Sequence, residues 1–129
     1  MNSDPLIAAA TAVRLHAYAP YSKFSVGAAL ESETGEIFLG CNVENISFGL
    51  TICAERGALQ AAITAGHRRF RRIVIVSDSQ IPVTPCGACR QCLAEFKEDL
   101  QVISANLSGE VYESDLQRLL PRAKAGILG

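Results

Sequence analysis

The positions of the cysteines constrain this chain more than any other feature. Cys53-Ala54-Glu55 is followed further along by Pro85-Cys86-Gly87-Ala88-Cys89. Three thiolates can hold a zinc ion while the carboxylate stays free. A structural zinc site fills all four coordination positions with protein ligands, whereas a catalytic site leaves one for water. We therefore predict Cys53, Cys86 and Cys89 as metal ligands and Glu55 as an acid–base group.

Apolar periodicity and turn residues predict an alternation of helices and strands. Ser3 or Asp4 can cap the first helix, with Pro5 in its first turn and its end before Tyr18. Residues 24–30 and 37–42 are expected to form a hairpin. Beyond it, the predicted elements are a helix over 53–65, a buried strand over 73–76, a helix over 86–96, strands over 101–105 and 111–112, and a helix from Ser114 to Leu120.

Residues 73–76 are wholly apolar, which is typical of a strand buried on both faces of a sheet. Together with the hairpin, this predicts an α/β fold: a three-layer α/β/α sandwich with a mixed central sheet. The 129 residues show no internal boundary, so we expect a single domain over 1–129.

Both predicted ligand segments start a helix, where unpaired N–H groups and the helix dipole favour a thiolate. Such helix starts gather near the carboxyl ends of strands in α/β sheets. Cys53 can thus meet Cys86 and Cys89 although they lie far apart in sequence. Arg56 could offset the negative charge of three thiolates, or it could form a surface ion pair.

Each candidate also has a plainer interpretation. Glu55 could merely stabilise the first turn of its helix. Cys92 could complete a structural four-sulfur site, but it lies about 4.5 Å further along the predicted helix axis, so we expect it to be a small core residue. Cys41 is interpreted in the same way. A thioredoxin-like use of Cys86 and Cys89 would leave Cys53 and Glu55 unexplained.

Composition narrows the class of protein. The net charge of −1 does not favour nucleic-acid binding, and no apolar run has the roughly 18 residues that a membrane span needs. Five cysteines, an odd number, fit a reducing cytoplasm better than a disulfide framework. Apolar residues make up 49% of this short chain, which suggests burial between subunits.

Four blocks carry a resemblance to a known family. They are Tyr21 to Ala29, Asn42-Val43-Glu44-Asn45, Thr51 to Arg56, and Pro85 to Gln91. The Cys-x-Glu and Pro-Cys-x-x-Cys motifs are similar to those of zinc nucleobase deaminases. With the Asn-Val-Glu-Asn block, the chain resembles the small homotetrameric, zinc-dependent cytidine deaminases over roughly residues 5–121.

The resemblance implies a cytoplasmic enzyme of pyrimidine salvage that deaminates cytidine and 2′-deoxycytidine, with Zn²⁺ as cofactor and active sites shared between subunits. Zinc-bound hydroxide would attack C4 of the base, with Glu55 as proton shuttle. Asn42 and Glu44 would bind the sugar hydroxyls, and Phe24 would pack in the nucleoside pocket. The N–H of Ala54 would hold the base carbonyl, and Arg56 would hydrogen-bond to the thiolates.

The chain departs from the family pattern near its end. Family members commonly carry an aromatic residue shortly after Leu119-Leu120-Pro121, where this sequence has none. Ile127 could cover the base instead, or the pocket could be more open. Phe48, where Tyr is common, is a milder change.

Three other functions remain open. One is a deaminase of a related aminopyrimidine nucleoside, such as an antibiotic. Another is a structural zinc protein without turnover. The third is a polynucleotide deaminase, for which His67 to Arg72 is the basic run that could contact nucleic acid, although such a run is more often solvated surface.

Overall fold

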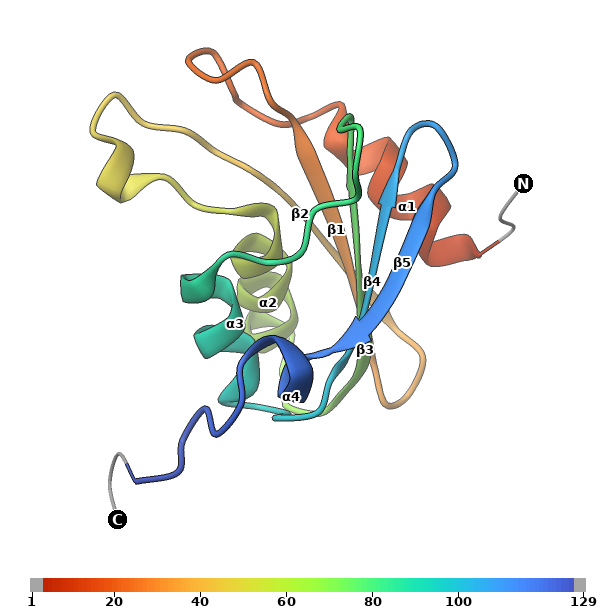
Figure 1. The fold of residues 1–129 in the computed structure, drawn as a ribbon, viewed down its shortest axis with the longest axis vertical. Helices are drawn as coiled ribbons and strands as arrows, with labels where there is room; N and C mark the ends of the chain where they lie inside the picture. The colour runs from red at the N-terminus through yellow and green to blue at the C-terminus, as the bar shows by residue number, and fades with distance from the viewer. Residues whose placement is uncertain (1–3, 127–129) are drawn as a thin grey trace.

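The structure, a computed structural model, describes residues 4–126 and contains one five-stranded mixed sheet. The strands lie in the order β2-β1-β3-β4-β5 (Figure 1). The strand bounds are β1 Val26–Ser32, β2 Ile37–Cys41, β3 Phe70–Ser77, β4 Gln101–Asn106 and β5 Val111–Asp115. The helices are α1 Pro5–Arg14, η1 Phe48–Leu50 (a 3₁₀ turn), α2 Ala54–Thr64, α3 Gly87–Ala94 and α4 Leu116–Leu119.

The strand directions bring the starts of two helices together. β1 is antiparallel to both β2 and β3, so β2 and β3 run in the same direction. Their carboxyl ends therefore lie at the same edge of the sheet. Because α2 follows β2 and α3 follows β3 along the chain, both helices begin near that edge, as we expected for the ligand segments.

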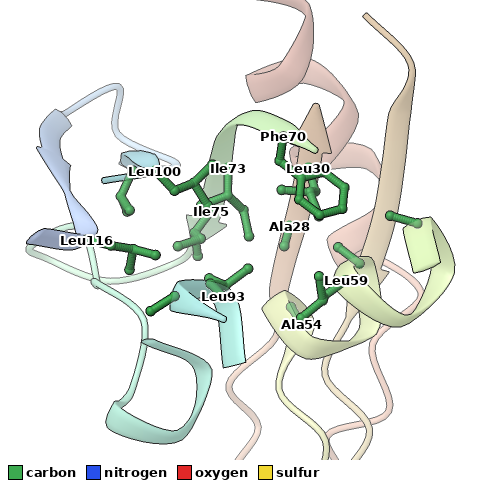
Figure 2. Close-up of a cluster of buried hydrophobic side chains, with 14 of the residues drawn as sticks. Ala28, Leu30, Ala54, Leu59, Phe70, Ile73, Ile75, Leu93, Leu100 and Leu116 are labelled. Carbon is green, nitrogen blue, oxygen red and sulfur yellow. The ribbon is translucent and has the colours of Figure 1, made fainter. Parts of the chain in front are cut away.

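The three predicted layers are present. Helix α1 covers one face of the sheet, and α2, α3 and α4 cover the other (Figure 1). Strand β3 serves both faces, because Ile73 and Ile75 pack with α2 and α3, whereas Val74 and Val76 pack with α1. Figure 2 shows the larger cluster, in which side chains from the sheet meet those of α2 and α3.

A close contact between backbones sets the distance of α2 from the sheet. A Cβ atom on Gly40 of β2 would lie 2.2 Å from the carbonyl oxygen of Ala54 and 2.3 Å from the amide nitrogen of Ala58. On the helix side, Gly57 faces Gly40. Ala58 and Ala62 are buried in the core of this same chain, so these two small residues of α2 serve packing within the subunit.

The first helix is shorter than its apolar pattern predicted. Asp4 caps α1, with its carboxylate accepting the N–H of Leu6 at 2.9 Å, but the helix ends at Arg14 rather than before Tyr18. The backbone of Tyr18 instead pairs with the segment after β2, donating to the carbonyl of Asn42 and accepting from the N–H of Glu44. This non-local pairing draws the chain away from the helix. Ser3, the other predicted cap, lies outside the described residues.

Other boundaries also differ from the prediction, among them those of β1, β3, α3, β5 and α4. Strand β3 begins at Phe70, because Phe70 pairs with Ser32 beyond a register shift in β1. Ser114 was expected to cap the last helix, but it lies within β5, and the Asp115 carboxylate caps α4 by accepting the N–H of Arg118 at 2.9 Å. Among residues 4–126, no helix is long and apolar enough to span a membrane.

Replacing Gly40 by alanine tests the close approach of α2. The new methyl group would overlap the helix backbone, so α2 must shift, and we expect Gly40→Ala to lower the free energy of unfolding by about 2 kcal/mol or more in urea denaturation. Gly49→Ala is the matched control, because a Cβ there meets nothing within 4 Å. Equal effects of the two substitutions would contradict the packing described here.

Candidate functional site

Three sulfur atoms meet at the starts of α2 and α3. Cys53 is the N-cap residue of α2 and Cys86 that of α3, and neither helix start has a side-chain cap. Cys89 lies in the first turn of α3 and is fully buried. The three Sγ atoms lie within 4.8 Å of one another, and those of Cys53 and Cys86 are 3.8 Å apart.

This cluster fits a zinc ion. A tetrahedral zinc with Zn–S bonds of about 2.3 Å separates its sulfur ligands by about 3.8 Å. Three thiolates would leave the fourth position to a water or substrate atom. Cys92, which could have completed a four-sulfur site, is not part of the cluster. Among the described residues, these three cysteines form the group with ligand spacing for a metal ion.

The Cys53 and Cys89 thiols differ in how readily they ionise. A hydrogen bond with Cys89 lowers the pKa of Cys53 to about 5, aided by Arg56 and Cys86, whereas the same contact and burial raise the pKa of Cys89. Arg56 donates to the sulfur of Cys53 at 3.5 Å and to the carbonyl of Thr51 at 3.4 Å. The structure thus places Arg56 beside the sulfurs rather than in a surface ion pair.

Glu55 is a buried carboxylate beside the sulfur cluster. Its side chain is only 5% exposed, and burial raises its pKa to about 7, with the charge of Cys53 acting in the same direction. A carboxyl group with a pKa near neutrality can both accept and donate a proton. The position therefore suits an acid–base group better than one that merely stabilises the helix start.

A pocket of about 340 Å³ opens beside this centre. Its volume is within the range of small-molecule sites. The walls combine the cysteine–glutamate centre with side chains from the segments around β1 and β2 and from the loop before α3. The lining residues are Ser22, Phe24, Val26, Asn42, Glu44, Thr51, Cys53, Ala54, Glu55, Val83, Thr84 and Cys86. All four residues predicted to contact a nucleoside, Phe24, Asn42, Glu44 and Ala54, are among them.

Asn42 and Glu44 are buried polar residues that also organise the chain before β1. The Asn42 amide accepts from the N–H of Val26 and donates to the carbonyl of Phe24, both at 2.8 Å. The Glu44 carboxylate accepts the N–H groups of Tyr21 and Ser22 and the hydroxyl of Ser22. These hydrogen bonds, led by the Ser22 hydroxyl, lower the pKa of Glu44.

Sequence reasoning missed part of the pocket. Val83 and Thr84 form the wall contributed by the loop before Cys86, and Ser22 contacts Glu44. Val83 and Thr84 directly precede Pro85-Cys86 in the sequence, and this closeness to a predicted ligand could have indicated that they line the pocket. The partners of Glu44 are over 20 residues away in sequence, and no local pattern indicates them.

Three predictions outside the centre need correction. Cys92 is exposed rather than in the core, because it lies on the outward side of α3, where it lines an apolar groove with Ile52 and Phe96. Cys41 is only half-buried in β2. The basic run is also not a uniform surface patch, since Phe70 is buried and Arg72 pairs with Asp4 and Glu31.

Comparisons with known proteins agree with the fold and with the sulfur cluster. The family model described as the cytidine and deoxycytidylate deaminase zinc-binding region matches residues 2–105. A cytidine deaminase of Sporosarcina psychrophila is 47% identical over 95% of this chain and 91% of its own, and one of Halalkalibacterium halodurans is 47% identical over 95% and 94%. The chain belongs to the zinc-dependent cytidine and deoxycytidylate deaminase family.

A solved structure and a more distant relative complete the comparison. The crystal structure of cytidine deaminase from Burkholderia pseudomallei superposes with a TM-score of 0.89 at 49% identity, covering 94% of this chain and 98% of that one. A blasticidin-S deaminase of Bacillus cereus is 32% identical over 78% of this chain and 76% of its own. The chain thus spans nearly the whole length of the more similar cytidine deaminases.

The sulfur cluster is tested by the zinc content of cysteine variants. We expect Cys53→Ser, Cys86→Ser and Cys89→Ser each to lose most of the bound zinc, measured per chain after purification, because each removes one of three ligands. Cys92→Ser is the matched control on the same helix and should keep the wild-type zinc content. Loss of zinc in Cys92→Ser would instead indicate a four-sulfur site.

Proposed function

We propose that this protein hydrolyses cytidine and 2′-deoxycytidine to uridine and 2′-deoxyuridine with release of ammonia, a reaction of pyrimidine salvage. The observation that carries the proposal is the buried carboxylate of Glu55, which shares one pocket with the cysteine cluster and with Asn42 and Glu44. The related cytidine deaminases support the choice of substrate.

Glu55 would be the group that accepts and donates protons in the reaction. Zn²⁺ held by Cys53, Cys86 and Cys89 would supply a Lewis acid that lowers the pKa of a bound water and so yields a nucleophile near neutral pH. Glu55 would accept the proton of that water and deliver it first to the ring nitrogen N3. As the oxygen of the water bonds to C4, a hydroxyl group forms there; Glu55 would take the proton of this hydroxyl and pass it to the amino group, so that the C4–N bond breaks, the C4=O of uridine forms and ammonia leaves.

The pocket walls support specific roles in binding the nucleoside. Phe24 is partly buried and faces the pocket, where its ring would pack against the substrate. The uncapped first turn of α2 offers the N–H of Ala54 to the base carbonyl. Arg56 would balance the charge of the thiolates through its hydrogen bond to Cys53.

Asn42 and Glu44 would bind the sugar. The Asn42 amide retains one N–H and a lone pair after its two protein contacts, and the ionised Glu44 carboxylate keeps acceptor sites. A vicinal diol both donates and accepts hydrogen bonds, so the two side chains are complementary to it. Their protein contacts would also hold them in place for binding.

Assembly is a second part of the proposal. The segment between β2 and α2 extends away from the sheet (Figure 1) and exposes Ile46 (81%), Phe48 (58%) and Leu50 (67%). An apolar groove of about 530 Å³ lies on the outer side of α2, lined by Leu59, Ile63 and others. Large exposed apolar surfaces of this kind are typical of interfaces. We therefore propose that subunits associate through these surfaces, and the resemblance to the homotetrameric cytidine deaminases supports four subunits with shared active sites.

We also propose that residues 1–129 form one catalytic domain that works in the cytoplasm. The single sheet with helices on both faces supports the first statement. The free cysteines support the second, because exposed thiols such as Cys86 and Cys92 persist best in a reducing compartment. Ile127, which we considered as a cover for the base, lies outside the described residues.

A related aminopyrimidine nucleoside is the second candidate substrate. The specific observation is the relationship to the Bacillus cereus blasticidin-S deaminase. Activity on blasticidin S without activity on cytidine would favour this alternative over the main proposal.

The decisive experiment is the loss of cytidine absorbance on addition of purified protein, with Glu55→Gln as the comparison. We expect uridine from the wild type, and from Glu55→Gln a loss of kcat by at least about 10²–10⁴-fold with zinc retained, because glutamine cannot carry the proton. A zinc-loaded wild type inactive on cytidine and deoxycytidine would refute the assigned substrate. Equal activity of Glu55→Gln would refute the role of Glu55.

The assembly is tested by light scattering coupled to size exclusion. We expect a molar mass of four times 13.8 kDa for the wild type. Leu50→Asp should shift the distribution to smaller species, because a charge would be buried at the interface. The solvent-facing Arg118→Ala is the control and should leave the mass unchanged. A monomeric wild type would contradict the proposal.

A further inference from the structure

Arg90 connects three parts of the chain next to the metal cluster. It follows Cys89 on α3 and is half-buried. Its Nε donates to the carbonyl of Pro85 at 2.7 Å and its Nη2 to the hydroxyl of Thr84 at 3.1 Å. Its Nη1 donates to the carbonyl of Leu119, at the end of α4, at 3.1 Å.

All three acceptors are neutral oxygen atoms. Within residues 4–126, no carboxylate forms an ion pair with Arg90. The guanidinium is therefore held by the directions of its hydrogen bonds. Its Nε and Nη2 bind two consecutive residues of the loop before α3, and its Nη1 binds the end of α4. A lysine ammonium is a single point of charge and cannot reach these three positions at once.

The loop that Arg90 contacts carries both a ligand and a wall of the pocket. Residues 78–86 join β3 to α3 without regular secondary structure, and they end at Cys86. Val83 and Thr84 line the pocket. At the other end of the loop, the buried Asn106 donates to the carbonyls of Ser79 and Gln80 at 3.0 and 3.1 Å. Asn106 and Arg90 thus hold the loop at its two ends.

Cys86 is the most exposed of the three predicted ligands. Its side chain is exposed, whereas Cys89 is buried. The start of α3 has no side-chain cap that would fix the N-cap residue. What restrains the backbone directly before Cys86 is the pair of hydrogen bonds from Arg90 to Thr84 and Pro85.

We infer that Arg90 is a positioning residue, which holds the sulfur of Cys86 and the Thr84 wall of the pocket in their working places and ties both to the end of α4. The inference deepens the proposed function, because it concerns the same site. Residues that orient metal ligands typically change metal affinity or activity by about 10–100-fold when they are removed.

The test compares Arg90→Gln and Arg90→Lys with Gln91→Ala. Gln91 is the neighbour of Arg90 on α3, and its amide donates to the carbonyl of Ala123 at 3.2 Å. Gln91→Ala therefore removes a contact to the C-terminal segment but none to the loop. Thermal unfolding of all three variants establishes that they are folded. Should Arg90→Gln fail to fold, Arg90→Lys, which keeps the positive charge, carries the comparison.

Three measurements report on the site without using substrate. Competition with a chelator gives the zinc affinity, the spectrum of the cobalt(II)-loaded protein reports sulfur coordination, and hydrogen exchange reports the amides of residues 79–86. We expect both Arg90 variants to bind zinc about 10–100-fold more weakly, to show altered sulfur-to-cobalt bands and to exchange faster before Cys86. Gln91→Ala should behave like the wild type in all three.

Two outcomes would overturn the inference. One is wild-type zinc affinity, cobalt spectrum and exchange in the Arg90 variants. The other is an equal loss in Gln91→Ala, which would indicate that loosening of the C-terminal segment, rather than of the loop, weakens the site. None of the three measurements involves cytidine, so a wild type inactive on cytidine would refute the proposed substrate while leaving the role of Arg90 intact.

Discussion

The contact between Gly40 and the first turns of α2 fixes the geometry on which the rest of the site depends. Because no side chain separates the two backbones, α2 lies directly against β2, and its first residues reach the edge where that strand ends. This places Cys53 and Glu55 beside Asn42, which follows β2 in the chain. One packing contact thus sets the spacing between the cysteine cluster and Asn42 in the pocket.

The second half of the centre depends on polar contacts rather than on close packing. Helix α3 brings Cys86 and Cys89, and the loop before it is held by hydrogen bonds from Asn106 and Arg90. Burial and charge then act together at the centre. Arg56 contributes to lowering the pKa of Cys53, whereas burial raises the pKa of Glu55 to about 7. The site therefore combines a charged metal position with a carboxyl group that can exchange protons.

Features that depend on residue chemistry and local periodicity could be predicted from the sequence. The cluster of three cysteines follows from thiol spacing, and the layers follow from the apolar run of β3, whose side chains pack on both faces. Features that depend on distant partners could not. The first helix stops early because Tyr18 pairs with residues after β2. Cys92 is exposed because the rotation of α3 is set by its neighbours. Nothing local indicates that Arg90 reaches Leu119.

The two faces of the sheet have separate sets of buried side chains. Leu6 and Ala10 of α1 pack with Val74, Val76 and their neighbours, and no residue of the pocket belongs to this set. The packing beneath α1 is therefore separate from the pocket. Substitutions that improve packing beneath α1 would raise the melting temperature without changing the residues of the pocket. The α1 face is therefore where the sequence can change most freely without loss of turnover.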